Sequence, residues 1–114
     1  MATLYTRTFS FKDSLSDAEV LELWQFTMET VIPAIQKVSG VRSVKAYSGA
    51  GALRADITVL IDMDDAAVYE RLLLDAAVRK HLGRLYGAWD LKSAGQSFRR
   101  EISAELIRAL SSTG

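Results

Sequence analysis

The chain holds a single histidine, His81, which lies in a basic run with Arg79, Lys80 and Arg84. Histidine changes charge near neutral pH, so His81 is a candidate general acid or base. The alternative is that His81 is an ordinary exposed or half-buried histidine on a helix. Tyr47 is a second candidate for moving a proton. These two residues, with Arg54 to hold an anionic oxygen, are the catalytic candidates.

Charged residues also recur along stretches that alternate as β-strands do. Arg7, Lys45, Arg54 and Asp56 occupy phases that can face a cavity. A buried Arg–Asp pair would bind a carboxylate or phenolate, or it would only hold the sheet together. The second role is favoured, because buried charges in proteins are usually paired.

Large aromatic side chains are the third kind of candidate, because they can line a pocket for a flat apolar ligand. Trp24 has helical spacing, which is more typical of a core residue, whereas Trp89 lies outside any periodic run and is the better pocket candidate. The predicted ligand-binding set comprises Arg7, Trp24, Tyr47, Arg54, Asp56, His81, Tyr86 and Trp89.

Several kinds of site are excluded or disfavoured. The chain has no cysteine, which excludes disulfides, iron–sulfur clusters and thiol nucleophiles. With one histidine and acidic residues that resemble helix caps (Asp62, Asp64, Asp65), no metal site is expected. A strand, not a helix, follows the glycines at 49 and 51, so they do not form a phosphate loop. No GxSxG motif is present. No cofactor is expected.

Composition and charge limit the partners. The 14 basic and 14 acidic residues cancel, which argues against nucleic-acid binding. No apolar run approaches the ~20 residues of a membrane span, and the N-terminus lacks a signal-peptide pattern. We therefore expect a cytoplasmic protein. A length of 114 residues, 49% of them hydrophobic, predicts a single domain over 1–114.

The first half of the chain predicts a strand followed by a helix. Residues 4–11 alternate, with Tyr5, Arg7, Phe9 and Phe11 on one phase. Ser16 and Glu19 fit a capping box that opens a helix with an apolar stripe to Val38. Pro33 predicts a kink or break around residues 29–32. Gly40 then ends the helix.

The rest predicts a hairpin, a second helical region, a strand and a tail helix. Residues 41–48 and 53–63 alternate as strands around a turn at 48–51. Asp64 and Asp65 would cap the next helix, Asp75 marks a break in it, and it ends at Gly87. Residues 89–92 are expected to be a loop, 93–102 a strand, and 103–111 a short amphipathic helix.

The order β-α-β-β-α-β predicts an α+β, ferredoxin-like fold with a four-stranded antiparallel sheet and both helices on one face. The other face then needs a cover. We expect Tyr5, Phe9 and Phe11 to form an exposed aromatic face, with Tyr47 and Phe98 recurring on other strands. An exposed aromatic face marks an interaction surface. The simplest cover is a second copy, which predicts a homodimer through the sheet faces.

The layout and three segments resemble the dimeric α/β-barrel superfamily. These segments are PAIQKVSGVRSV (33–44), IDMDDAA (61–67) and VRKHLGRLYG (78–87). The superfamily includes stress-responsive barrel proteins and antibiotic-biosynthesis monooxygenase-like proteins. The resemblance implies a dimer and a cleft between sheet and helices in each subunit, but no single chemistry. Its haem-degrading members use a histidine with asparagine and tryptophan, and this chain has no asparagine.

These residues and the resemblance together leave two candidate functions. The favoured one is a dimeric module that binds a small apolar or aromatic molecule in the cleft without a catalytic motif. The alternative is a cofactor-independent monooxygenase or isomerase acting on an aromatic or polyketide-like substrate. His81 or Tyr47 would then move a proton, and Arg54 would stabilise the substrate anion. The two differ in whether the polar strand residues and His81 converge on one cavity.

Overall fold

A computed structural model describes residues 2–49, 54 and 56–112, and the predicted ferredoxin-like fold is confirmed. The sheet has four antiparallel strands in the order β2-β3-β1-β4. They are β1 (Thr3–Phe11), β2 (Val41–Ser48), β3 (Ile57–Met63) and β4 (Trp89–Arg100). The helices are α1 (Asp17–Phe26), η1 (Thr27–Val31), α2 (Ile32–Gln36), α3 (Ala67–Leu74), α4 (Ala76–Tyr86) and α5 (Ala104–Ser112).

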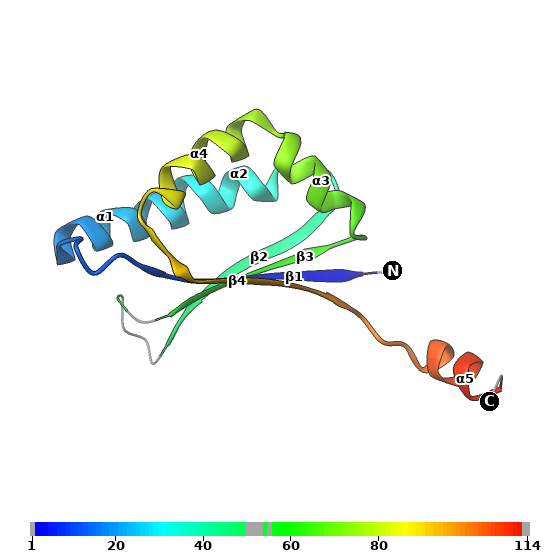
Figure 1. Cartoon of the computed structure of the whole chain (residues 1–114). Helices are drawn as coiled ribbons and strands as arrows, with labels where there is room; N and C mark the ends of the chain where they lie inside the picture. The colour runs from blue at the N-terminus through cyan, green and yellow to red at the C-terminus, as the bar shows by residue number, and fades with distance from the viewer. Residues whose placement is uncertain (1, 50–53, 55, 113–114) are drawn as a thin grey trace.

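Figure 1 shows two layers: helices α1, α2, α3 and α4 lie over one face of the sheet, and the opposite face carries no helix. The tail helix α5 lies apart from both layers, beyond the end of β4. Among the described residues, no helix is long and apolar enough to cross a membrane.

Strand β1 lies inside the sheet and shows which phase the helices cover. Tyr5 and Phe9 pair with Ile61 and Ile57 of β3, and all four are buried. The prediction that Tyr5, Phe9 and Phe11 form an exposed face is therefore wrong. These rings have the largest apolar area in the strand, and burying them under the helices gives the largest gain.

The open face of the sheet is built from the other phase. Its members on β1 and β3 are Leu4, Thr6, Thr8, Thr58, Leu60 and Asp62. Lys45 and Tyr47 of β2 lie opposite Leu60 and Thr58 on this face, and Ser97 and Arg99 of β4 lie opposite Thr6 and Leu4. Phe98 is on the covered side, where its ring contacts Tyr5 at 5.0 Å. The open face is thus rich in hydroxyl groups, with two leucines and a tyrosine.

The first helix begins and breaks where the sequence predicts. The Ser16 hydroxyl accepts from the Glu19 N–H at 3.1 Å, and Glu19 accepts from the Ser16 N–H at 3.0 Å, which is a capping box. The helix widens into the π-turn η1 before Pro33, whose ring and missing N–H disrupt the preceding turn. Thr27 Oγ1 donates to the Leu23 carbonyl at 2.8 Å and satisfies one acceptor there.

Gly40 closes the helical segment in a conformation that favours glycine. Its φ is +93°, and a Cβ there would lie 2.5 Å from Cγ2 of Val68, a fully buried residue of α3. The hairpin follows, but β3 starts at Ile57, later than predicted, and Arg54 lies in a turn. The predicted strand start at 53 and half of the predicted turn, residues 50 and 51, fall outside the described residues.

The second helical region divides at Asp75 as predicted, and Asp75 Oδ1 caps α4 by accepting from the Val78 N–H at 3.0 Å. Asp65 Oδ1 accepts from the Ala67 N–H at 2.9 Å, whereas Asp64 pairs with Arg42 at 2.7 Å. Asp65 therefore serves the start of α3, and Asp64 holds strand β2.

The predicted loop at 89–92 is instead the first part of β4. Trp89 pairs with Phe11, and its ring stacks on Phe9 with centroids 4.0 Å apart. A register shift in the β1–β4 pairing between Thr8 and Ser10 accommodates this extension. The pairing with β1 and the burial of the indole outweigh the weak strand pattern of the local sequence.

Candidate functional site

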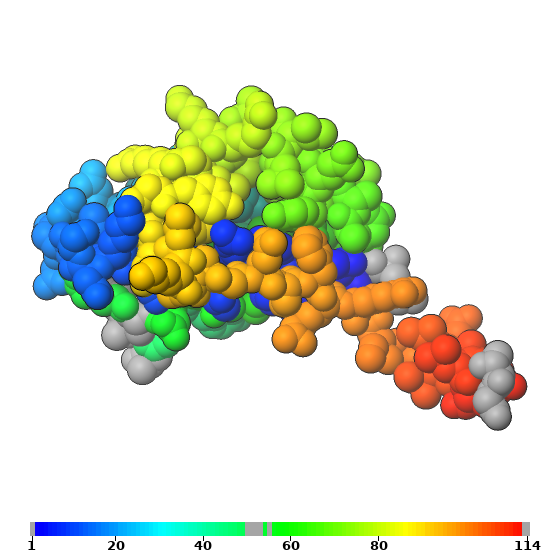
Figure 2. Space-filling model, in the orientation of Figure 1, coloured from blue at the N-terminus to red at the C-terminus, as the bar shows by residue number. Residues whose placement is uncertain are grey.

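A cavity of about 70 Å³ lies between the covered face of the sheet and the helices. This is several times the ~10–15 Å³ that one water molecule requires. Exposed Leu73 and Tyr86 are among its lining residues, so the cavity reaches the surface. In Figure 2 a recess lies between α3 (green) and α4 (yellow) above β4 (orange), and atoms of the N-terminal segment (blue) are visible in it.

Most of the wall is aliphatic or aromatic. β1 contributes Tyr5, Arg7 and Phe9, and β4 contributes Trp89. The helices and β3 supply mainly branched aliphatic side chains, which are Val31, Ile32, Ile35, Val59, Ile61, Leu72, Val78, Leu82 and Leu85. Such a wall favours an apolar ligand.

The polar groups gather at the β1–β4 side. Arg7 and Gln96 are directly paired across the two strands. Gln96 Oε1 accepts from the Tyr5 hydroxyl at 2.9 Å and from Arg7 Nη1 at 3.1 Å. This shared acceptor fixes the orientation of both side chains at the cavity wall.

Arg7 is held against aromatic rings. Its guanidinium carbon lies 5.1 Å from the centroid of Trp89 and 5.6 Å from that of Tyr86. A cation over a ring face is attracted to the ring quadrupole, more strongly where water is excluded. The charge is therefore positioned in an apolar environment without a carboxylate within ion-pair distance among the described residues.

Two N–H donors of this group are buried without a partner in the described part of the chain: Arg7 Nε and Trp89 Nε1. An unpaired buried donor costs about 1–3 kcal/mol. Both belong to side chains that line the cavity. An oxygen acceptor that reached these donors would regain that cost, and an anionic oxygen would also pair with the guanidinium.

Tyr5 cannot serve as a base at neutral pH. Burial raises the pKa of the Tyr5 hydroxyl well above its usual range. The group therefore stays protonated and acts as a hydrogen-bond donor. Tyr69, whose ring stacks on Tyr5 with centroids 4.7 Å apart, forms the wall beside it.

Of the predicted ligand-binding residues, Arg7, Tyr86 and Trp89 line the cavity. His81 does not: its ring contacts the edge of Phe26 at 5.6 Å, and it lies in a separate surface groove with Glu29, Lys37 and Asp75. His81 is half-buried where α4 lies against η1 and α2, so its side chain meets those helices and not the cavity. Trp24 is half-buried on α1 and packs against the core outside the cavity.

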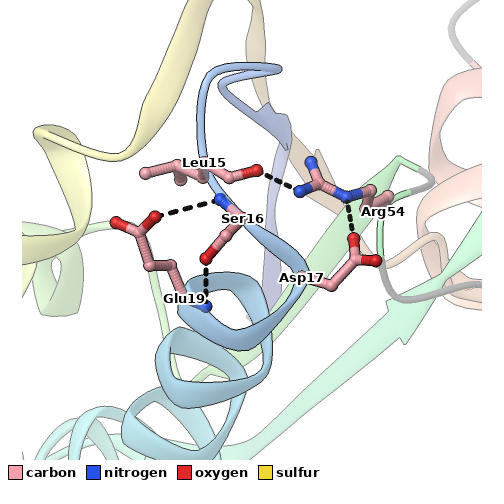
Figure 3. A network of polar contacts seen from close by, with 5 residues as sticks. All are labelled: Leu15, Ser16, Asp17, Glu19 and Arg54. Atoms are coloured by element: carbon pink, nitrogen blue, oxygen red, sulfur yellow. Dashed lines mark hydrogen bonds and ion pairs between the residues drawn. The ribbon is translucent and has the colours of Figure 1, made fainter.

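Arg54 and Asp56 do not form the predicted pair. Arg54 Nε donates to Asp17 Oδ1 at 2.7 Å, and its guanidinium also reaches the Leu15 carbonyl (Figure 3). Asp56 accepts from the Ser10 hydroxyl at 3.0 Å. Because β3 begins only at Ile57, neither residue is in a strand that faces the cavity.

Tyr47 lies on the open face of the sheet and is 52% exposed. The predicted catalytic candidates His81, Tyr47 and Arg54 are thus on three different surfaces, and none lines the cavity.

Sequence reasoning missed Tyr5, Tyr69 and Gln96. Tyr5 shares a strand phase with Arg7, and Gln96 lies on the strand that pairs with β1, so the alternation contained a signal for both. Tyr69 carried no such signal, because its position depends on how α3 packs. Among the described residues, no group of three or more histidine, aspartate or glutamate side chains is placed to hold a metal ion.

No protein-family model matches the chain, and no curated protein matches it in sequence. Solved structures do match in fold. A dimeric protein of unknown function with a ferredoxin-like fold from Bacteroides fragilis is 13% identical, with a TM-score of 0.74 over 88% of this chain and 96% of that one. The chain therefore shares the ferredoxin-like fold of such proteins.

Two further neighbours in fold have names that describe an activity. SnoaB, a cofactor-independent oxygenase from Streptomyces nogalater, is 10% identical, with a TM-score of 0.68 over 90% of this chain and 95% of that one. A putative antibiotic biosynthesis monooxygenase from Nitrosomonas europaea is 6% identical, with a TM-score of 0.73 over 89% and 99%. At these identities the likeness concerns the fold.

Proposed function

We propose that this barrel-fold protein binds a small flat molecule that carries an acceptor oxygen, held in the cavity between sheet and helices. The observation that supports this most is the pair of buried, unpartnered donors, Arg7 Nε and Trp89 Nε1, on side chains that line an apolar cavity. The oxygen would lie between the two donors, and the flat body of the ligand would contact the aliphatic wall. A carboxylate or phenolate suits this site best, because Arg7 is charged.

The apolar part of the ligand would supply much of the affinity. Removing about 100 Å² of ligand surface from water contributes about 2.5 kcal/mol. Exposed Leu73 and Tyr86 at the opening would let a ligand longer than the enclosed space extend outward.

Binding without a chemical step agrees best with the wall composition. Among the described residues that line the cavity, none is a carboxylate or a histidine. Two hydroxyls of the wall have fixed partners: Tyr5 is held protonated by burial, and Thr27 donates to the Leu23 carbonyl. A general base is therefore missing from the described wall, and proton removal would fall to a substrate that ionises readily by itself.

Cofactor-independent oxygenation is the second candidate, favoured by the position of Arg7 over Trp89 at the wall of a largely apolar cavity. A cation there would lower the pKa of an acidic CH2 group conjugated to an aromatic ketone. The resulting carbanion can give one electron to O2, and recombination gives a hydroperoxide. Loss of water then leaves a new carbonyl, so CH2 and O2 become C=O and H2O. Arg7 would stabilise the anion before oxygen reacts.

We also propose that the chain forms a homodimer through the open face of the sheet. That face carries Leu4, Leu60 and Tyr47 among hydroxyl side chains, and no helix in the described part of the chain covers it. Neighbours from Bacteroides fragilis and Thermobifida fusca are described as dimeric. A two-fold axis through this face would place each open face against its copy.

The binding proposal is tested by isothermal titration of naphthalene-2-carboxylate and of the neutral naphthalene-2-carboxamide. Wild-type protein should bind the carboxylate at least about ten-fold more tightly, because a charged hydrogen bond in an apolar site contributes about 1.5–3 kcal/mol. Arg7→Met should remove this preference but keep weak binding of both compounds. Arg79→Met, which removes an exposed cation of α4, is the matched control. Equal affinity of wild type and Arg7→Met for the carboxylate would contradict the proposal.

Oxygenation is tested with anthrone, an aromatic ketone that has an acidic CH2 group. If the second candidate holds, the protein should raise the rate of O2 consumption and anthraquinone formation above the buffer rate, and Arg7→Met should abolish the increase. Binding of naphthalene-2-carboxylate without faster anthrone oxidation would leave the binding function alone.

A further inference from the structure

The chain ends in an arm that its own body does not cover, which we define as residues 101–112 and which contains α5. None of the nine residues of α5 is buried. Yet the helix is formed locally: the Ser103 hydroxyl accepts from the Leu106 N–H at 3.1 Å, which caps its first turn. The arm is an ordered helix with an exposed apolar side.

That apolar side is continuous. Leu106, Ile107 and Leu110 lie on one side of α5, while Glu105 and Arg108 lie off it, and Ile102 precedes the helix within the arm. Ile102, Ile107 and Leu110 are 69%, 49% and 60% exposed. A stripe of this kind on a folded helix is typical of a surface that packs against another element.

The arm lies on the side where the proposed dimer partner belongs. In Figure 1 the chain leaves β4, bends away from the helical layer, and places α5 beyond the sheet toward its uncovered side. The radius of gyration is 16.4 Å, whereas a compact chain of this length would have about 13 Å. An arm held this far from its own core, on that side, is placed to reach a second copy.

A groove lies at the edge of the sheet opposite β4. A surface groove of about 470 Å³ runs along the edge strand β2 and is lined by Met28, Pro33, Gln36, Lys45, Ala46 and Tyr47. We call it the β2 groove. Met28 and Tyr47 are each about half exposed, at 51% and 52%. The groove thus offers apolar surface, and Lys45 offers a positive charge to Glu105 of the arm.

We propose that the arm of each copy packs into the β2 groove of the other copy, so that two arms clasp the dimer. This rests on the proposed dimerisation through the open sheet face, and it adds a reciprocal contact at the sheet edge. Tyr47 belongs to both surfaces, since it lies on the open face and lines the groove, so the two contacts would be continuous. An exchanged arm of this kind obeys the isologous symmetry of a dimer. It would also cover the exposed edge of β2, where an unpaired strand otherwise invites aggregation.

The absence of cysteine from the sequence allows a clean cross-linking test. Ile107→Cys, carrying an affinity tag, is mixed with untagged Met28→Cys, incubated to allow subunit exchange, and oxidised. We expect a covalent species that contains one tagged and one untagged chain, because a disulfide needs Cα atoms within about 7 Å. Arg79→Cys, on the exposed side of α4, replaces Met28→Cys as the control and should give little mixed product.

Sedimentation in the ultracentrifuge separates failure of the clasp from failure of the dimer. The full-length double variant Leu106→Ser/Ile107→Ser should dimerise at least about ten-fold more weakly than wild type, as loss of central apolar contacts does at interfaces. A wild-type dimer that gives no mixed cross-link, or a double variant that dimerises as tightly as wild type, would overturn the clasp and leave the sheet-face dimer standing. A monomeric wild type would overturn both. A cross-link within single chains of the Met28→Cys/Ile107→Cys double variant would place the arm on its own body and also overturn the clasp.

Discussion

The two faces of the sheet differ in what they do with the same alternating strands. On the covered face, aromatic and aliphatic side chains surround a cavity with Arg7 and Trp89 at its polar end. On the open face, threonine and serine hydroxyls alternate with Leu4, Leu60 and Tyr47. The aromatic phase thus lines the cavity, and the hydroxyl-rich phase is the one left open for the proposed second chain.

This difference shows that ring content alone does not identify an interaction surface. In a sheet with helices on one face only, the helices cover the face whose side chains have the most apolar area, because burying apolar area contributes about 25 cal/mol per Å². The face left for a partner is the more polar of the two. Interfaces between chains are commonly about as apolar as the remaining surface, so a mixed face is compatible with dimerisation.

The largest expected difference between the two faces is in stability, and Phe9→Ala tests it. Phe9 is 2% exposed and stacks on Trp89, so its removal leaves a void in the covered side. We expect the free energy of unfolding to fall by about 3–5 kcal/mol in urea denaturation. Thr58→Ala, on the open face, should cost below about 1 kcal/mol at protein concentrations that keep the chain monomeric. Similar losses for the two variants would erase the contrast between the faces.

Gly40 tests how tightly the covered side closes. Gly40→Ala brings a Cβ to 2.5 Å from Val68 Cγ2 at a backbone φ of +93°. We expect a loss of about 1–3 kcal/mol from backbone strain, with further loss from the contact. Gly83→Ala is the opposite case, because a Cβ at this position on α4 meets nothing within 4 Å. It should stabilise the protein by up to about 1 kcal/mol, so thermal melts of the two variants should shift in opposite directions.

Leu60→Lys tests the open face. Leu60 lies between Thr6 and Lys45 on neighbouring strands, and a lysine there would add a like charge beside Lys45 at the centre of the proposed interface. We expect dimerisation to weaken by about ten-fold or more, measured by sedimentation equilibrium. Leu74→Lys, at an exposed position on α3, should leave the association unchanged. Equal dimerisation of Leu60→Lys and wild type would place the interface elsewhere.

The smallest effect concerns the start of α1, away from both faces. The hydrogen bond from the Ser16 N–H holds the pKa of Glu19 below its usual value of 4.5. The stabilising contribution of Glu19 is therefore present above that value and is lost as the pH falls through the lowered pKa. Glu19→Gln keeps an acceptor and should match wild type at pH 7. Below pH 4.5 it should lose less stability than wild type in urea titrations. Parallel pH profiles would contradict this.

The sequence predicted the fold through local signals. The capping box at Ser16, the break before Pro33, the cap at Asp75 and the glycine at position 40 each act within a few residues, so they can be recognised without the structure. Trp89 to Lys92 lacked such a signal, because their strand conformation comes from pairing with β1.

The candidate site was only partly predictable. Arg7, Tyr86 and Trp89 reach the cavity, but strand alternation does not say which phase the helices cover. Arg54 does not reach the cavity because its guanidinium pairs with Asp17 at the start of α1, and these two residues are far apart in sequence. The direction of the His81 side chain depends on how α4 is rotated about its own axis. That rotation is set by the packing of Val78 and Leu85. Contacts between residues far apart in sequence therefore decide which side chains reach the cavity.

The central claim is that the cavity on the covered face binds an acceptor oxygen between Arg7 and Trp89. The most direct measurement follows the two indole N–H signals in proton–nitrogen correlation spectra during titration with naphthalene-2-carboxylate. Trp24→Phe assigns the signals. We predict that the Trp89 signal shifts strongly on binding, because its unpartnered N–H gains an acceptor, while the Trp24 signal stays in place. Binding that leaves the Trp89 signal unmoved, or no binding at all, would contradict the account.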